Sequence, residues 1–224
     1  MLKFYYAPLS PVARRVRLAL LEKSIPFESV LLNLDGDQLQ PEFLEMNPFH
    51  HVPVIVDDGF RIVESLAILD YLEAKYPTPA LLPTQPKALA TVRMVQMVTA
   101  NELFPQTIPL IYENEESSKF LQAKQHIDKV LQFFTQILGD SPYFGSEQLT
   151  LADIVAGTVV PSLPRLDINL NDYPKLHDWC GRLMQRKAWQ KTDVSAEDFE
   201  QFKRKVQALV KLRKREMSWG NKAQ

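Results

Sequence analysis

Two pairs of neighbouring residues near the start of the chain could bind a small charged molecule. Ser10 stands directly before Pro11, and Glu64 stands directly before Ser65. Serine is a preferred helix cap and proline is favoured at the first helical position, so we expect both serines at helix N-termini. A helix N-terminus attracts anions through its free N–H groups and its dipole. The Glu64-Ser65 pair therefore suits the cationic amine and the carboxylate of an amino-acid-like group.

The Ser10 hydroxyl could serve two purposes at once. A hydroxyl has two acceptor lone pairs and one donor hydrogen. Its oxygen can accept a hydrogen bond from the helix backbone while its hydrogen points at a bound anion. Capping alone explains a serine at this position, so the sequence leaves open whether the hydroxyl also takes part in chemistry.

Hydrophobic periodicity predicts the elements that would position these residues. A period of two indicates strands, whereas apolar residues at spacings of three and four indicate helices. Asp58-Gly59 is a pair that a two-residue hairpin turn favours. The predicted order is strand 2–6, a helix from Pro11 to near Lys23, strand 27–34, a short helix from Pro41, a hairpin turning at Asp58-Gly59, and helix 64–76. Residues 1–76 are thus predicted to be β-α-β-α-β-β-α.

The rest of the chain is predicted to be all-helical. Four prolines between positions 77 and 86 mark a linker, because they are too dense for a helix or a sheet interior. Two long amphipathic segments follow, KALATVRMVQMVTANELF and SKFLQAKQHIDKVLQFFTQIL, the second ending at Gly139. LTLADIVAGTVVPSL is nearly all apolar, as a buried central helix requires. We therefore expect a first domain at 1–76, a linker at 77–86 and a helical domain at 87–224.

Composition restricts the class of protein. The 26 basic and 27 acidic side chains nearly cancel, which gives no sign of a nucleic-acid partner. The single cysteine, Cys180, fits a reducing compartment, and the four histidines lack the spacing of a metal site. No apolar run approaches about 18 residues. We expect a cytoplasmic protein without metal or integral membrane association.

Basic residues concentrate at the C-terminal end of the chain. Residues 203–224 carry eight basic and one acidic side chain, whereas residues 1–76 carry seven and eleven. An apolar stripe runs between these charges, formed by Phe202, Val206, Leu209, Val210 and Leu212. The favoured interpretation is a solvated helix that packs this stripe over the mouth of a site. Attraction to an anionic membrane surface or to nucleic acid is the alternative.

The combination of these features resembles the soluble glutathione transferases, over the whole chain. The resemblance depends on Ser10, Val52-Pro53 and Glu64-Ser65 in the first half, followed by a proline-rich linker and a helical half. LTLADIVAG is similar to the family's buried capping-box helix, and YPKLHDWCGRLMQRKAW is similar to its next-to-last helix. Serine-type members of the delta and theta-like classes have the most similar pattern. The resemblance implies a thioredoxin-like first domain and a homodimer.

The resemblance also implies how glutathione, as co-substrate, would be held. Pro53 would be cis, so that the Val52 backbone pairs with the cysteinyl part of the tripeptide. Glu64 and Ser65 would hold the γ-glutamyl amine and carboxylate. His50, in the loop NPFHHVP, would lie near the glycyl carboxylate.

Two positions depart from the delta-like pattern. Leu66 stands where an arginine often follows the Glu-Ser pair, and Gln38 stands where a histidine often precedes the second helix. Gln38 could still donate a neutral hydrogen bond. The glycyl and glutamyl ends of glutathione are therefore expected to be held differently or more weakly than in those enzymes.

Three residues are candidates for activating the thiol. A free thiol has a pKa of about 8.5, and the thiolate is the nucleophile. Lowering that pKa by about 2 units requires about 2.7 kcal/mol, which a hydroxyl hydrogen bond and a helix N-terminus can supply together. Ser10 is the principal candidate. Tyr6 is an alternative because Tyr6-Ala7-Pro8 is similar to the motif of tyrosine-type transferases, and Arg14 is a third.

The second substrate is expected between the two halves. Its predicted lining consists of Leu9, Phe104, Ile108 and Tyr112. We expect the glutathione thiolate to attack a hydrophobic electrophile there, without a tightly bound cofactor. The alternatives are a glutathione-dependent isomerase, peroxidase or dehalogenase, and a non-catalytic scaffold that retains the fold.

Overall fold

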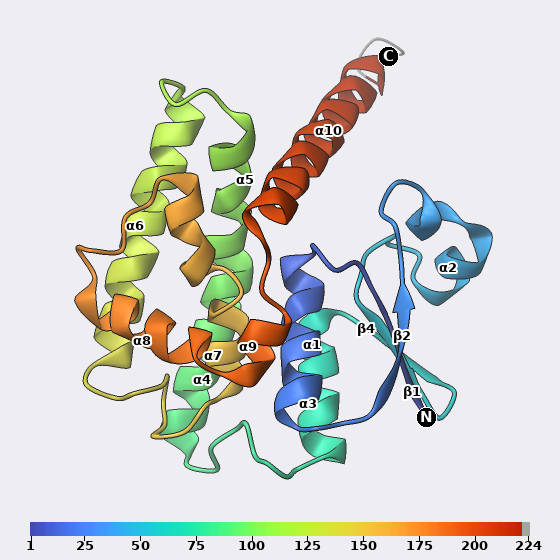
Figure 1. Cartoon of the computed structure of the whole chain (residues 1–224). Coiled ribbons are helices and arrows are strands. Elements are labelled where there is room, and N and C mark those ends of the chain that lie inside the picture. The colour runs from blue at the N-terminus through green and yellow to red at the C-terminus, as the bar shows by residue number, and fades with distance from the viewer. Residues whose placement is uncertain (221–224) are drawn as a thin grey trace.

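The computed structural model describes the backbone of residues 1–220 and the side chains of residues 1–211. A small sheet with its helices lies beside a larger group of helices, and the end of the last helix extends away from both (Figure 1). The sheet comes from the first third of the chain, and the regular elements described after it are helices. Among the described residues, no helix has both the length and the hydropathy needed to cross a membrane.

The first half has the predicted order of elements. It consists of β1 (Leu2–Tyr6), α1 (Pro11–Glu22), β2 (Phe27–Leu31), α2 (Pro41–Met46), β3 (Val54–Asp57), β4 (Phe60–Val63) and α3 (Ser65–Lys75), with a 3-10 turn at Asp37–Leu39. The four strands form one sheet in the order β2-β1-β3-β4. β1 is parallel to β2 and antiparallel to β3, and β3 and β4 form an antiparallel hairpin. The prediction of an α/β first half is confirmed.

Local signals explain these elements. The alternation of β1 buries Leu2, Phe4 and Tyr6 on one face of the sheet. In the hairpin, Asp58 has φ 50° and Gly59 has φ 81°, as a two-residue turn with two positive φ angles requires. The Asp58-Gly59 turn therefore fixes the pairing of β3 with β4 as predicted.

The second strand is shorter than predicted. It ends at Leu31 rather than at residue 34, because its partner β1 ends at Tyr6, which pairs with Leu31. Leu32 still donates a hydrogen bond to the Tyr6 carbonyl, at 2.9 Å. The chain then turns, and the Asn33 N–H bonds the Asp37 carboxylate at 2.7 Å.

The second half is helical, as predicted. Its α-helices are α4 (Pro86–Val98), α5 (Phe104–Tyr112), α6 (Ser118–Leu138), α7 (Leu151–Ala156), α8 (Pro174–Met184), α9 (Lys187–Lys191) and α10 (Ala196–Gly220). A π-helical turn at Thr99–Leu103 connects α4 to α5, and a 3-10 helix occupies Val160–Leu166. The π turn ends two positions before Pro105, which lacks the N–H that a regular helix needs.

The apolar segment LTLADIVAGTVVPSL does not form one helix, contrary to expectation. α7 ends at Ala156, and Pro161 and Pro164 then remove the N–H groups that an α-helical ladder would need. Gly157 follows α7 in a crowded position, where an added Cβ would lie 2.5 Å from the Asp153 carbonyl oxygen. α7 is nevertheless fully buried, as predicted.

The predicted capping box of α7 is confirmed and forms the centre of a buried network. The Thr150 side chain caps the helix, and the Thr150 N–H donates to the Asp153 carboxylate at 2.8 Å. The same carboxylate accepts hydrogen bonds from Trp179 Nε1 at 2.8 Å and from the Phe144 N–H at 3.0 Å. Burial raises the pKa of Asp153 to about 6. These bonds connect α7 to α8 and to the preceding loop.

Candidate active site

Ser10 is the N-cap of α1, as predicted. Its backbone is extended, with φ −76° and ψ 116°, and its Oγ accepts a hydrogen bond from the Ala13 N–H at 3.2 Å. Within the described part of the chain, the hydroxyl hydrogen has no acceptor. The oxygen of Ser10 is therefore used for capping, and its hydrogen is free for another partner.

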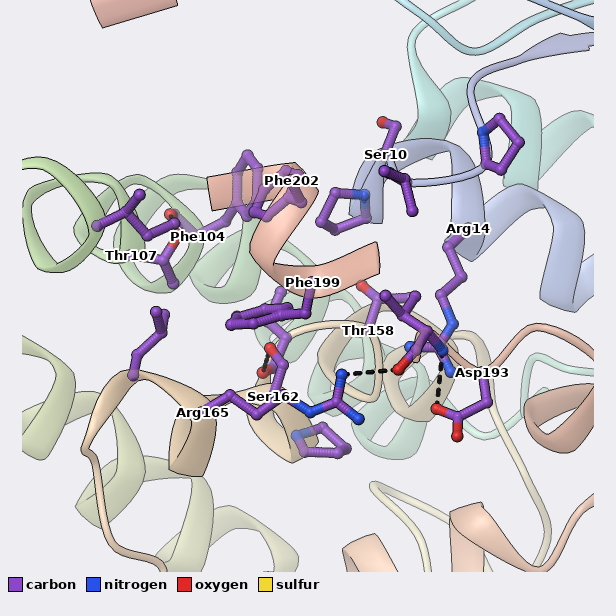
Figure 2. A pocket seen from close by; sticks show the side chains of 18 of the residues that line it. Ser10, Arg14, Phe104, Thr107, Thr158, Ser162, Arg165, Asp193, Phe199 and Phe202 are labelled. Atoms are coloured by element: carbon purple, nitrogen blue, oxygen red, sulfur yellow. Dashed lines mark hydrogen bonds between the residues drawn. The ribbon is translucent and has the colours of Figure 1, made fainter. Parts of the chain in front are cut away.

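Three neighbouring hollows meet at this serine, and Ser10 and Phe104 line all of them. We call them the polar groove, the apolar cavity and the outer groove. The polar groove is formed largely by the loops before β3 and α3. The apolar cavity lies between α1, α5, the 3-10 helix and the start of α10 (Figure 2). The outer groove runs between the loop after β2 and α10.

The polar groove collects every residue predicted to bind glutathione. Its lining includes Gln38, His50, Val52, Pro53, Glu64 and Ser65, together with Ser10. The Val52-Pro53 peptide bond is cis, as the resemblance implied. The structure thus brings these residues to one surface, although they are spread over more than fifty positions of the sequence.

Two residues of the groove have positive φ angles, 57° at His50 and 67° at Glu64. Such angles are uncommon outside glycine and cluster at functional sites. Glu64 precedes α3, and its carboxylate makes no cap hydrogen bond to the helix. That carboxylate is therefore available to a cationic group in the groove.

Arg15 is a site residue that sequence reasoning missed. It is only 2% exposed, and its Nη1 donates a hydrogen bond to Ser65 Oγ at 3.4 Å. Its Nε and Nη2 are buried without hydrogen-bond partners. Burial lowers the pKa of Arg15 to about 10, against the opposing effect of the Glu64 carboxylate. The burial of Arg15 could have been inferred from Leu18 and Ala19, because these apolar residues lie three and four positions later on the same helical face.

Asn47 is a second missed residue, and it holds the histidine loop. It is 1% exposed, and its side chain bonds the His51 carbonyl at 2.8 Å and the Phe49 N–H at 3.1 Å. Asn47 therefore fixes the loop backbone that carries His50 towards the cis proline. The signal was an asparagine directly before a proline, which is typical of a turn.

Gln38 lines the groove, but its amide is occupied within its own loop. Its Nε2 donates to the Leu34 carbonyl at 3.0 Å, and its Oε1 accepts from the Gly36 N–H at 3.2 Å. These two bonds orient the amide, and its second Nε2 hydrogen is left for a ligand. Its predicted role as a glutathione ligand stays a prediction.

Tyr6 lies in the core rather than in any of the three hollows. Its ring stacks on Phe4 with centroids 4.4 Å apart, and the Arg17 guanidinium lies 5.5 Å from its centroid. Tyr6 is 5% exposed. This position agrees with a strand residue that packs the sheet and offers no route to a bound thiol.

Arg14 lines the apolar cavity, but its side chain runs away from the Ser10 hydroxyl towards Asp193 (Figure 2). Its Nε donates a hydrogen bond to Thr192 Oγ1 at 3.3 Å. The alternative in which Arg14 stabilises a thiolate beside Ser10 therefore has no geometric support.

The apolar cavity includes two of the four residues predicted to contact the second substrate. Leu9 and Phe104 line it, whereas Ile108 and Tyr112 line none of the three hollows. α5 instead turns Thr107 and Ile111 to the cavity, three and seven positions after Phe104, and Ile108 packs in a neighbouring hydrophobic cluster. The predicted residues of α5 are four positions apart. The residues that border the cavity are spaced by three and then four positions, as on one face of a helix. Phe199 and Phe202 of α10 complete the wall.

This architecture, a four-stranded mixed sheet with a cis proline before β3 followed by a helical half, defines a thioredoxin-like domain joined to an all-α domain. Residues 4–80 match the family model "Glutathione S-transferase, N-terminal domain", and residues 97–187 match "Glutathione S-transferase, C-terminal domain". The chain belongs to the glutathione S-transferase family.

Individual relatives agree with this assignment. The chain is 28% identical to glutathione S-transferase D7 of Drosophila melanogaster over 92% of its own length and 95% of that protein. It is 32% identical to maleylacetoacetate isomerase of Rattus norvegicus over 79% of its length and 84% of that protein. A solved delta-class glutathione transferase of Nilaparvata lugens superposes with a TM-score of 0.80, 26% identity and coverage of 93% and 99%. A solved epsilon-class glutathione S-transferase of Musca domestica superposes with a TM-score of 0.78 and 27% identity. The match covers 94% of this chain and 97% of that protein.

Proposed function

We propose that this protein conjugates the thiolate of reduced glutathione to hydrophobic electrophiles, and that Ser10 activates the thiol. One observation carries the proposal. The Ser10 hydroxyl caps α1 with its oxygen, has a free hydrogen, and lies where the polar groove meets the apolar cavity. A donor in that position can stabilise an anionic sulfur at the border between the two substrates.

Glutathione would occupy the polar groove. In this proposal Glu64 and Ser65 hold the γ-glutamyl amine and carboxylate, and the Val52 backbone pairs with the cysteinyl part beside Pro53. His50 lies towards the glycyl carboxylate, with Gln38 close to the same end. The support is that all six residues line one groove together with Ser10.

The free energy required of Ser10 is modest. Lowering a thiol pKa by about 2 units corresponds to about 2.7 kcal/mol of preference for the thiolate. A charge-assisted hydrogen bond contributes about 1.5 to 3 kcal/mol, and a helix N-terminus adds about 0.3 to 1 kcal/mol. Ser10 at the start of α1 combines both effects, so a covalent enzyme intermediate is unnecessary.

The electrophile would occupy the apolar cavity. Leu9, Phe104 and Phe202 supply a hydrophobic and aromatic wall beside Ser10.

A glutathione-dependent isomerase is the second candidate function. Two relatives, from Rattus norvegicus and Mus musculus, are named maleylacetoacetate isomerase and are 32% and 33% identical to this chain. An isomerase would use the same thiolate but release glutathione unchanged. Measuring whether free thiol is consumed during turnover distinguishes the two functions.

We also propose a homodimer in the cytoplasm, built from a glutathione-binding domain at 1–76, a linker at 77–86 and a helical domain at 87–224. α3 ends at Lys75 and α4 begins at Pro86, which supports the linker. Exposed Met94 and Met97 on α4 give the monomer an apolar surface that a second copy could cover. Size-exclusion chromatography with light scattering tests the dimer, and a fully active monomer would contradict it.

Titration of bound glutathione by thiolate absorbance tests the role of Ser10. We expect Ser10→Ala to raise the thiol pKa by about 1 to 2 units and to lower kcat by about 10- to 100-fold. Tyr6→Phe should leave the thiol pKa unchanged. An unchanged pKa in Ser10→Ala, with a raised one in Tyr6→Phe, would reverse the assignment. Failure of the wild-type protein to bind glutathione would refute the proposal that it is a glutathione-dependent enzyme.

A further inference from the structure

The apolar cavity contains two arginines besides its hydrophobic wall. Arg14 comes from α1 and Arg165 from the 3-10 helix, and the lining also includes one carboxylate, that of Asp193. Figure 2 shows both arginine side chains converging on the Asp193 end of the cavity, while the Ser10 hydroxyl lies at the opposite end. Two guanidinium groups against one carboxylate leave this end of the cavity with a net positive charge.

Arg165 is held by other residues of the protein. Its Nη1 donates a hydrogen bond to the Val194 carbonyl at 2.7 Å, and its guanidinium lies 5.4 Å from the centroid of the Phe199 ring. These contacts orient Arg165, and the rest of its guanidinium is exposed to solvent.

Arg14 is not satisfied in the same way. Its Nε reaches Thr192 Oγ1 at 3.3 Å, but its Nη2 is buried without a hydrogen-bond partner. None of the ion pairs among the described side chains includes Arg14, and the Asp193 carboxylate instead accepts from the Val194 N–H at 2.9 Å. Burial lowers the pKa of Arg14; Arg165 and Arg17 act in the same direction, and Asp193 opposes them. The positive charge has thus lost water without gaining an anion in contact.

We infer that Arg14 is an anion subsite for the second substrate, and that the preferred electrophiles carry a carboxylate on an aromatic or unsaturated body. A guanidinium donates charge-assisted hydrogen bonds to a carboxylate, and such bonds are stronger where water is excluded. This inference rests on the proposed function and adds a substrate class to it.

The position of Arg14 also sets the size of the electrophile. Arg14 lies four positions after Ser10, a rise of about 6 Å along the helix, and its side chain extends further away from Ser10 (Figure 2). A carboxylate held at Arg14 would therefore leave room for one aromatic ring between itself and a carbon near the glutathione sulfur. The wall of Phe104, Phe199 and Phe202 suits such a ring.

Matched electrophiles test the subsite directly. In 4-chloro-3-nitrobenzoate and 4-chloro-3-nitrobenzamide, the thiolate forms a C–S bond at the carbon that carries chlorine, and chloride leaves with the electron pair of the C–Cl bond. Each kcat/KM is divided by the uncatalysed rate constant, which removes the difference in intrinsic reactivity. We expect the wild-type enzyme to favour the benzoate by about tenfold.

Variants of α1 then assign that preference to one side chain. Arg14→Met should abolish the preference while benzamide conjugation persists, and Arg14→Lys should retain part of it. Arg17→Met is the matched control, because it removes another guanidinium from the same helix, and it should leave the preference unchanged. The inference is overturned if the wild type shows no preference, if Arg14→Met retains it within twofold, or if Arg17→Met reduces it equally. Failure of the proposed function has a different signature, since the wild type would then consume no glutathione with either compound.

Discussion

The guanidinium of Arg15 lies 3.4 Å from Ser65 Oγ, although 50 positions separate the two residues in the chain. Arginine can only donate hydrogen bonds, so the serine oxygen is the acceptor. The Ser65 hydroxyl hydrogen is therefore left to donate to something else, and the α3 N-terminus favours an anion there. With a pKa of about 10, Arg15 remains protonated at neutral pH. Leu66 occupies the position where delta-like enzymes often have an arginine, and Arg15 instead places a positive charge beside Ser65 from α1.

We predict that Arg15→Met raises the KM for glutathione by about tenfold and changes kcat less than threefold, because the side chain acts on binding rather than on the sulfur. A purely structural role would weaken all ligands equally. The second readout is therefore a glutathione analogue whose γ-glutamyl carboxylate is amidated. The wild type should discriminate strongly against this analogue, and Arg15→Met should discriminate little.

Arg15→Lys keeps the charge and should restore part of the discrimination. The prediction is wrong if Arg15→Met weakens the binding of glutathione and of the amidated analogue by the same factor. It is also wrong if the KM for glutathione does not change in a variant that folds normally by circular dichroism.

Short-range signals in the sequence were sufficient for the order of elements in residues 1–76. The alternation of β1, the proline at the start of α1 and the Asp58-Gly59 turn each act within a few residues, so they can be recognised without tertiary information. The burial of Arg15 could not be recognised in this way. α1 packs against α3 on one side and against α7 and α9 on another, so its buried positions extend around the helix. A single apolar stripe does not describe a helix that is covered on two sides.

The lining of the apolar cavity was predicted only in part for a similar reason. Phe104 and Leu9 are in the cavity, but Ile108 and Tyr112 are not. Phe104, Ile108 and Tyr112 all lie within α5, and a spacing of four advances about 40° beyond a full helical turn, so Ile108 and then Tyr112 turn away from the face that carries Phe104. Which face of α5 borders the cavity is set by its packing against α10 and the 3-10 helix, which hydrophobic periodicity alone does not reveal.

Asp153 provides a prediction on stability. Replacing it with alanine would leave the N–H groups of Phe144, Thr150 and Trp179 buried without their acceptor. We expect Asp153→Ala to lower the free energy of unfolding by about 3 to 5 kcal/mol, as measured by urea denaturation. Asp178→Ala, at an exposed position of α8, is the comparison and should cost much less. A loss below about 1 kcal/mol in Asp153→Ala would show that the network does not support the fold.

Cys180 provides a prediction on pH dependence. Burial raises the pKa of this thiol to about 12, whereas an unfolded cysteine has a pKa of about 8.5. The thiolate fraction falls about tenfold for each pH unit below the pKa, so at pH 8.5 the folded protein should contain almost none, whereas about half of the unfolded thiols are ionised. We expect iodoacetamide to label Cys180 at least 100-fold more slowly in the native protein than in urea. Comparable rates in the two states would contradict the buried position.

Phe202 provides a prediction that separates the two substrates. Its ring lines the apolar cavity and the outer groove, but it does not line the polar groove that holds the predicted glutathione ligands. Removing the ring should therefore weaken the binding of the electrophile and leave the binding of glutathione unaffected. We expect Phe202→Ala to raise the KM for 1-chloro-2,4-dinitrobenzene by about 5- to 20-fold, the range for losing one aromatic contact, with the KM for glutathione changed less than twofold. Phe202→Leu retains most of the apolar volume, so its KM for the electrophile should lie between those of the wild type and Phe202→Ala. Equal increases in both KM values would mean that α10 supports the whole site rather than the wall of the apolar cavity.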